Sequence, residues 1–150
     1  TWASWVIPAN TLKTNQVVHV VIIFDFLKNT GGAETVTLRV KYGATTLFAD
    51  ASASITNNAA RRDGRCEFWL SGDAATNIQL LRGYWVTGAP TAATSGTGDL
   101  AGALGNSGAN WGGSAAEDST ADKTLAVTIQ HSGASANLSS RLLYAFAEVA

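Results

Sequence analysis

Residues 17–27, VVHVVIIFDFL, are the stretch that decides the fold class. Side chains alternate between the two faces of a β-strand, and one face here would carry only apolar residues: Val18, Val20, Ile22, Phe24 and Phe26. The opposite face would also be largely apolar, with two polar exceptions, His19 and Asp25. Because both faces are apolar, the pattern predicts a strand that is buried on both sides. The run is too short to span a bilayer, so we expect no membrane partner.

Most of the other apolar runs also alternate with period two. The residues expected to face the core are Val36, Leu38, Val40, Tyr42, Cys66, Phe68, Leu70, Leu125, Val127 and Ile129. In the last run we expect Leu142, Tyr144 and Phe146 to share one face. Turn residues separate these runs, and no long segment has the 3.6-residue period of a helix. The pattern predicts an all-β sandwich of about eight antiparallel strands, for which a jelly roll is a suitable architecture.

Two segments depart from this pattern. Residues 88–122 are mostly Gly, Ala, Ser, Thr, Asn and Asp, which predicts a long excursion with a short strand near residues 100–104. Arg61, Arg62 and Arg65 form the one basic cluster, and acidic neighbours dilute its charge. We interpret that cluster as a solvated turn rather than a phosphate site.

The composition is poor in charge. Only 14% of the 150 residues are charged, against a usual share of about 25%. This low charge suggests that part of the surface is covered by a large interface instead of water. The net charge of −1 gives no indication of the basic surface that nucleic-acid binding requires.

The sequence contains no recognisable catalytic set and implies no cofactor. Cys66 is the only cysteine, and its place in an alternating run predicts a small buried residue rather than a nucleophile. His19 lies in the most apolar run, where a core or interface histidine is expected. Neither His19 nor His131 has the clustered Cys or carboxylate partners that a zinc site needs.

The acidic residues Glu117, Asp118 and Asp122 lie close together and could in principle bind Ca²⁺. The regular spacing of calcium loops is absent, however, so we expect a solvated acidic loop and no metal site. A hydrolase would need two carboxylates that face each other across a cleft, which the sequence cannot show.

Three tryptophans remain as candidate ligand-binding residues. Trp69 and Trp85 are expected on the face opposite the core, where a second sheet, a neighbouring subunit or a sugar ring could cover them. Trp111 lies in the Gly-rich segment SGANWGGS, where it could dock on a neighbour or a ligand. We favour burial for Trp69 and Trp85 and leave Trp111 open.

Both ends of the chain resemble virion proteins of tailed phages. The resemblance rests on the phrase IPANTL at residues 7–12, the turn NTGGA at 29–33 and the hairpin LRVKYGATTL at 38–47. Residues 121–150 look like the last two strands of the same domains. The likeness covers residues 7–50 and 121–150, about half of the chain, and consists of turn residues and hydrophobic pattern rather than catalytic signatures.

This resemblance implies a TNF-like jelly roll over residues 7–150, usually a homotrimer, in a phage particle. The leading hypothesis is a non-enzymatic capsid decoration (cement) protein that binds the major capsid protein on the outside of the virion. A second copy of the chain would then cover the outer face of the 17–27 strand. The candidate trimer-interface residues are His19, Val21, Ile23, Tyr144 and Phe146.

The first residues pose a separate question, because Trp2 and Trp5 precede the phrase that opens the look-alike domains at Ile7. We expect residues 1–6 to form an arm outside the domain, with Trp2, Trp5 and Ile7 docking on the capsid or a neighbouring subunit. An arm folded back on its own subunit is the alternative.

The alternative function for the whole chain is a receptor- or carbohydrate-binding module of a tail appendage, with Trp69, Trp85 or Trp111 stacking on sugars.

Overall fold

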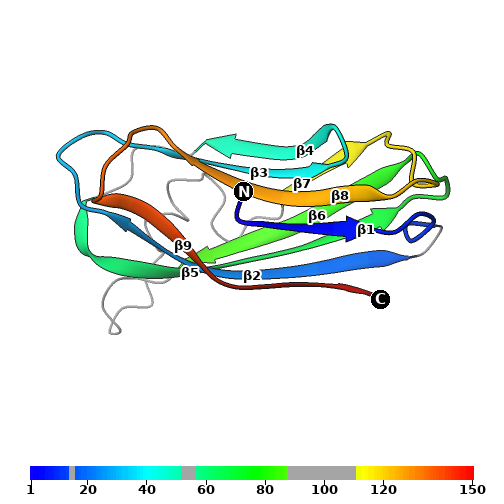
Figure 1. Ribbon diagram of the computed structural model, residues 1–150, viewed down its shortest axis with the longest axis horizontal. Helices are drawn as coiled ribbons and strands as arrows, with labels where there is room; N and C mark the ends of the chain where they lie inside the picture. Colours follow the sequence, from blue (N-terminus) through cyan, green and yellow to red (C-terminus); the bar gives the residue numbers. More distant parts are fainter. Residues whose placement is uncertain (14–15, 52–56, 88–110) are drawn as a thin grey trace.

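The protein is a sandwich of two antiparallel β-sheets, as the sequence predicts (Figure 1). The computed structural model describes residues 1–13, 16–51, 57–87 and 111–150, with the main chain alone for residues 85–87 and 111. Sheet A contains, in spatial order, β1 (Ala3–Ile7), β8 (Lys123–His131), β3 (Val36–Tyr42) and β4 (Thr45–Ala51). Sheet B contains β7 (Trp111–Ala115), β6 (Gln79–Thr87), β5 (Asn58–Gly72), β2 (Val17–Lys28) and β9 (Leu138–Val149). The described ranges include no helix.

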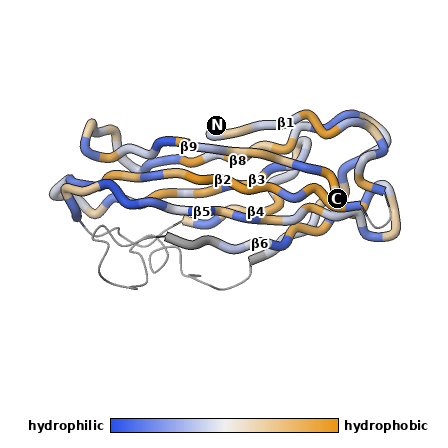
Figure 2. Tube along the Cα trace, turned by 90° about the horizontal axis from the view of Figure 1, so that it is seen from below, coloured by the Kyte–Doolittle hydropathy of each residue, from blue (hydrophilic) through white to orange (hydrophobic). Residues whose placement is uncertain are grey.

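Strand β2 lies between β5 and β9 and supplies much of the core, and Figure 2 shows its hydrophobic run in this position. All five residues predicted to face inward are buried, and they pack against the inward residues of sheet A. On the other face of β2, Val21 and Asp25 are also buried, while His19 and Ile23 are half-buried. The prediction of a strand buried on both sides is therefore confirmed for much of its length.

Strand β9 contains an irregularity that the sequence pattern did not predict. Tyr144 pairs with Ile23, but Phe24 pairs with Leu142, so Leu143 is an extra residue in the ladder. Such a β-bulge interrupts the alternation of faces. The expectation that Leu142 shares a face with Tyr144 and Phe146 is therefore wrong, because Leu142 lies opposite an inward-facing residue.

The basic cluster is not a solvated turn, because residues 58–72 form one long strand, β5. Arg62 is only 1% exposed and its guanidinium lies 5.3 Å from the centre of the Phe26 ring. The cation is thus stabilised partly by an aromatic face. Arg61 and Arg65 emerge on the opposite face of sheet B, where they contact carboxylates.

The first residues are part of the sandwich and not an arm outside it. Residues 3–7 form β1, which pairs with β8 at the edge of sheet A. The Trp2 amide donates to the Val127 carbonyl at 2.8 Å, and the Trp2 ring lies 4.8 Å from that of Phe24. Trp5 also packs against the core, and Ile7 is buried in it. The predicted boundary between residues 6 and 7 is corrected in favour of the folded-back alternative.

The long excursion is shorter than predicted. Residues 111–115 form β7 at the edge of sheet B, and the Thr120 amide closes a turn onto Asp118 before β8 begins. Residues 88–110, with the strand predicted near residues 100–104, lie outside the described residues.

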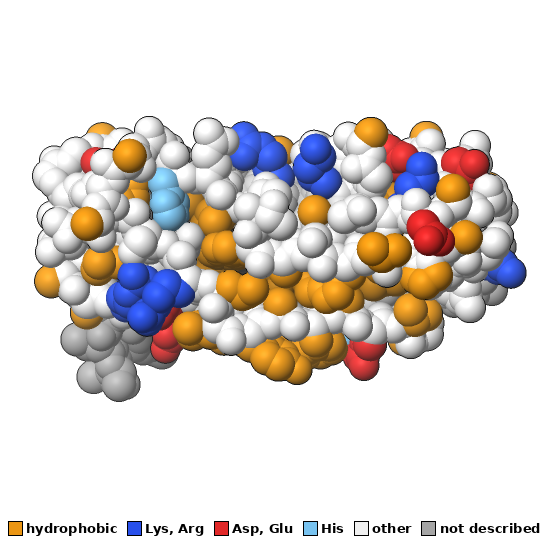
Figure 3. All heavy atoms as spheres, in the orientation of Figure 1, with side chains coloured by type: hydrophobic (Ala, Val, Ile, Leu, Met, Phe, Trp, Pro, Cys, Tyr) orange, Lys and Arg blue, Asp and Glu red, His pale blue; other side chains and the backbone are white. Residues whose placement is uncertain are grey.

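The two long sides of the sandwich differ. On one side β4 and β7 approach closely, because Gly113 lies against the main chain of Leu47. On the other side β1 and β9 form the sheet edges, and a band of hydrophobic side chains runs between them (Figure 3). We call this second side the open side.

Candidate functional site

The outer face of sheet B gathers all five candidate trimer-interface residues. His19, Val21 and Ile23 follow one another along the outer face of β2, and on β9 they pair with Glu148, Phe146 and Tyr144 respectively. Residues that pair directly in an antiparallel ladder lie on the same face and in contact distance. The five residues therefore form one continuous patch, in which Tyr144 is 57% exposed and Phe146 is half-buried.

His19 is the centre of a polar cluster at one end of this patch. Its Nε2 lies 2.8 Å from Glu67 Oε1, and its Nδ1 lies 3.0 Å from Glu148 Oε1. Desolvation would lower the pKa of His19, but the hydrogen bonds and negative charges of both glutamates outweigh it and raise the pKa above 6.5. Trp69 stacks on the imidazole at 5.1 Å, so the charged form is also held against an aromatic face.

Glu67 connects this cluster to β6. It is buried and accepts hydrogen bonds from the Tyr84 hydroxyl and from Arg65, the latter at 2.6 Å. Burial would raise the pKa of Glu67, but the hydrogen bonds from Tyr84 and His19 and the charge of Arg65 lower it overall. Glu67 and Glu148 are therefore bridged through the imidazole and do not face each other across an open cleft, as a glycosidase pair would.

A second charged cluster, which sequence analysis missed, lies at the other end of the patch. Asp25 is buried, and it binds Arg61 at 2.6 Å and the guanidinium of Arg141. The hydrogen bond from Arg141 and the charges of both arginines hold the pKa of Asp25 below its ordinary value. An acidic residue inside the most apolar run was the available signal, because a buried carboxylate needs a partner.

The three candidate tryptophans do not form a common site. Trp69 lies on the outer face of sheet B, as predicted, and is 37% exposed in the single chain, so no second sheet within the described residues covers it and burial by a neighbouring subunit stays a prediction. Trp85 pairs with Cys66 in the β5–β6 ladder and Trp111 pairs with Gly83, but their side chains lie outside the described atoms. Trp69 is thus the one of the three whose exposure is described.

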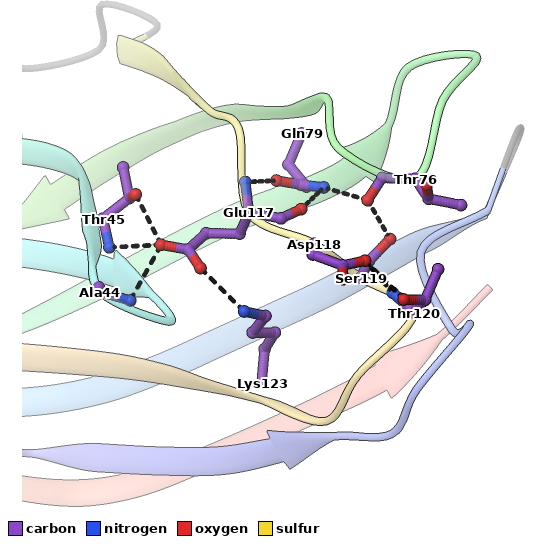
Figure 4. A network of polar contacts seen from close by, with 9 residues as sticks. All are labelled: Ala44, Thr45, Thr76, Gln79, Glu117, Asp118, Ser119, Thr120 and Lys123. Atoms are coloured by element: carbon purple, nitrogen blue, oxygen red, sulfur yellow. Dashed lines mark hydrogen bonds and ion pairs between the residues drawn. The ribbon is translucent and has the colours of Figure 1, made fainter.

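The acidic residues after β7 hold loops together (Figure 4). Glu117 Oε1 accepts hydrogen bonds from the amides of Ala44 and Thr45, both at 3.0 Å, and Glu117 Oε2 binds Lys123 at 3.0 Å. Gln79 makes two hydrogen bonds with the main chain of Glu117, at 2.8 and 3.0 Å. This carboxylate therefore fastens the β3–β4 turn to the loop before β8.

The other two carboxylates of this group have separate partners. Asp118 accepts from the amide and hydroxyl of Thr120, and Asp122 accepts from the Ala9 amide at 2.7 Å. The three groups do not converge on one point, and in the part of the chain that the structure describes no three potential ligands cluster as a metal site would require. The description of these residues as a solvated loop is wrong for Glu117, which is mostly buried.

We expect Glu117→Gln to lower the free energy of unfolding by about 1–2 kcal/mol at pH 7, because charge-assisted hydrogen bonds are lost. Hydrogen bonds from Thr45 and Lys123 hold the pKa of Glu117 below its ordinary 4.5. The carboxylate therefore stabilises the fold above pH 4.5, and this contribution disappears as the pH falls through the lower folded-state pKa. Urea unfolding at pH 7 and pH 3 should show the difference between wild type and variant shrinking.

Asp73→Asn removes the same charge from an exposed turn and serves as the control. An equal loss of stability in both variants, or a loss for Glu117→Gln that does not depend on pH, would contradict the role of this carboxylate.

The thiol of this chain is buried, and the carboxylates near His19 are already hydrogen-bonded. Burial raises the pKa of the Cys66 thiol well above its ordinary value, so the thiolate nucleophile is suppressed. Glu67 and Glu148 both bind the His19 imidazole, and an aromatic and apolar surface lies between the two charged clusters. Among the described residues there is no helix that is long and apolar enough to cross a bilayer.

No protein-family model, no curated protein and no solved structure matches this chain.

Proposed function

We propose that this chain is a non-enzymatic structural protein of a tailed-phage virion, and specifically a homotrimeric decoration protein of the capsid exterior. The proposal joins the resemblance of residues 7–50 and 121–150 to the two-sheet architecture. Strands from opposite ends of the chain are paired, β1 with β8 and β2 with β9, which is a feature of Greek-key and jelly-roll paths. We accordingly propose a TNF-like jelly roll for the sandwich.

The observation that carries the proposal is the patch on the outer face of sheet B. It places apolar and aromatic side chains, including Tyr144, on a surface that a monomer would expose to water. Closed cyclic assemblies are the common way to bury such a repeated surface. The charged clusters around His19 and Asp25 flank the patch and would set its orientation against a neighbouring copy.

A trimer would bind the shell through several equivalent contacts at once. Each trimer would present three equivalent contact surfaces to the major capsid protein, and the second and third contacts would form at high effective concentration. Bridging neighbouring capsomers in this way lowers the free energy of the closed shell relative to the separated subunits.

Light scattering after size exclusion should give a mass that is a multiple of three copies for the wild type and a smaller mass, not a multiple of three, for Ile23→Lys. The reason is that Ile23 lies in the middle of the patch, where a lysine would have to be desolvated on assembly. Val6→Lys is the matched control, because it places the same charge on a more exposed position of sheet A. A wild type of single-copy mass, or equal masses for both variants, would contradict the trimer.

Capsid binding is tested by co-sedimenting the trimer with phage shells that lack decoration proteins. Retention on shells and a raised shell-disruption temperature are expected, and the absence of both would overturn the capsid assignment.

A second candidate, carbohydrate binding by a tail appendage, is favoured by one observation, the exposed Trp69 beside two glutamates. A reproducible glycan-array signal that Trp69→Ala abolishes would support this second function instead.

A further inference from the structure

The outer side of β9 is a free edge of sheet B. Within the described residues, β9 is hydrogen-bonded to β2 on one side and has no strand on the other. Soluble proteins usually protect such edges with charges, prolines or short strands. β9 has 12 residues, and three consecutive large apolar residues at its bulge are exposed: Leu142, Leu143 and Tyr144.

The two charges of β9 suggest what covers this edge. Arg141 precedes the apolar run and Glu148 follows it, and their side chains are 58% and 59% exposed. If a second β9 ran antiparallel alongside, Arg141 of each copy would lie opposite Glu148 of the other. A parallel, in-register neighbour would instead oppose like charges, which is unfavourable in a ladder.

We propose that the β9 edge pairs antiparallel with β9 of a second copy of this chain, across a two-fold axis at Ala145. Leu143, the extra residue of the bulge, is left out of this register. The two B sheets then form one continuous sheet of ten strands, and the hydrophobic band of the open side is covered (Figure 3). A two-fold contact of this kind is self-complementary and closes without further growth. It protects the edge from unlimited edge-to-edge association.

The intrachain partners of these charges remain in place. Arg141 keeps its contact with Asp25, and Glu148 keeps its contact with His19, since both side chains have exposed atoms to spare. The exposed ion pairs therefore set the register, whereas main-chain hydrogen bonds and apolar burial supply the affinity. The contact uses the main-chain edge of β9 and leaves the β2 side of the patch free, so it goes beyond the proposed trimer and does not rest on it.

Disulfide trapping tests this register. Opposed residues of antiparallel strands have Cα atoms about 4.5–5.5 Å apart, which is within disulfide reach. Residue 145 lies on the proposed axis and opposes residue 145 of the second copy, so Ala145→Cys can form a disulfide with its counterpart. The native Cys66 is fully buried and does not compete. Under a mild oxidant, we expect disulfide-linked dimer on a non-reducing gel at least tenfold faster than for Ala134→Cys, which lies in an exposed turn.

Two further variants separate the possible outcomes. Leu143→Lys puts a charge on the exposed bulge and should halve the wild-type mass in solution, whereas Ile78→Lys, at an exposed apolar position on another loop, should not. Ala145→Cys should still cross-link when combined with Ile23→Lys, which tests the trimer patch alone. Cross-linking no faster than in Ala134→Cys, or equal masses for Leu143→Lys and Ile78→Lys, would overturn the β9 contact whatever the fate of the trimer.

Discussion

Removing residues 1–6 is expected to lower the free energy of unfolding by about 3 kcal/mol or more, the range in which buried aromatic side chains are lost. The truncation deletes most of β1, uncovers the edge of β8 and takes the Trp2 ring away from Phe24. It also removes Trp5 from the margin of the core. The effect should appear as a lower urea midpoint at equal protein concentration.

Val6→Ser is the control for this truncation. Val6 belongs to the same strand, but its side chain points away from the core and is exposed. We expect a change within about 0.5 kcal/mol, as for most surface substitutions. If the truncated chain unfolded at the wild-type midpoint, β1 would contribute nothing to its own subunit, and a docking role for these residues on a partner would regain support.

The second large effect is expected at Gly113, where β7 of sheet B meets β4 of sheet A. A Cβ atom on residue 113 would lie far inside the contact distance of the Leu47 carbonyl oxygen. Because this obstacle is main chain rather than a flexible side chain, Gly113→Ala has to separate the two strands. We expect a loss of about 3 kcal/mol, at the upper end of overpacking penalties, together with faster hydrogen exchange along β4.

Gly31→Ala is the matched control, since an added Cβ at Gly31 would meet no atom within 4 Å. Its stability should stay within about 0.5 kcal/mol of the wild type. A Gly113→Ala protein with wild-type stability would show that β4 and β7 do not close that side of the sandwich in solution.

The alternating pattern predicted the core well, because burial repeats at every second residue along a strand. The inward residues of β2 and the Cys66, Phe68 and Leu70 set of β5 lie where the pattern placed them. The alternation of buried and exposed residues is a local property of each strand, and it predicts burial in the same way for every strand of a sandwich. The pattern also placed the five residues of the outer patch on two strands that turned out to be neighbours.

The errors arose where structure depends on distant partners or on a single inserted residue. The bulge at Leu143 changes the face of every following residue, and alternation alone does not reveal it. The sequence predicts an arm in place of β1 because the partner strand, β8, lies more than a hundred positions away, although Trp5 and Ile7 do alternate with Ser4 and Val6. The sequence predicts a solvated Arg62 because an isolated charge gives no sign of the aromatic ring that lies against it.

The sequence predicted which apolar residues lie on the outer face of sheet B, but it did not predict the ion pairs of the site. The sequence predicts a core or interface histidine at His19, but its glutamate partners come from β5 and β9, and only strand pairing shows that they meet. The same is true of Asp25, whose arginines lie 36 and 116 positions along the chain. Such long-range ion pairs leave no local spacing that a motif could capture.

The pairing of the first strands with the last ones has a consequence for biosynthesis. Ala3 pairs with Val127 and Val18 pairs with Val149, so neither sheet can be completed until the ribosome has translated the end of this segment. Until then the nascent chain carries VVHVVIIFDFL without one of its two neighbouring strands. Contacts of such long sequence separation form slowly and leave apolar strands open to aggregation in the meantime. We therefore expect β2 to be a binding target for molecular chaperones during translation.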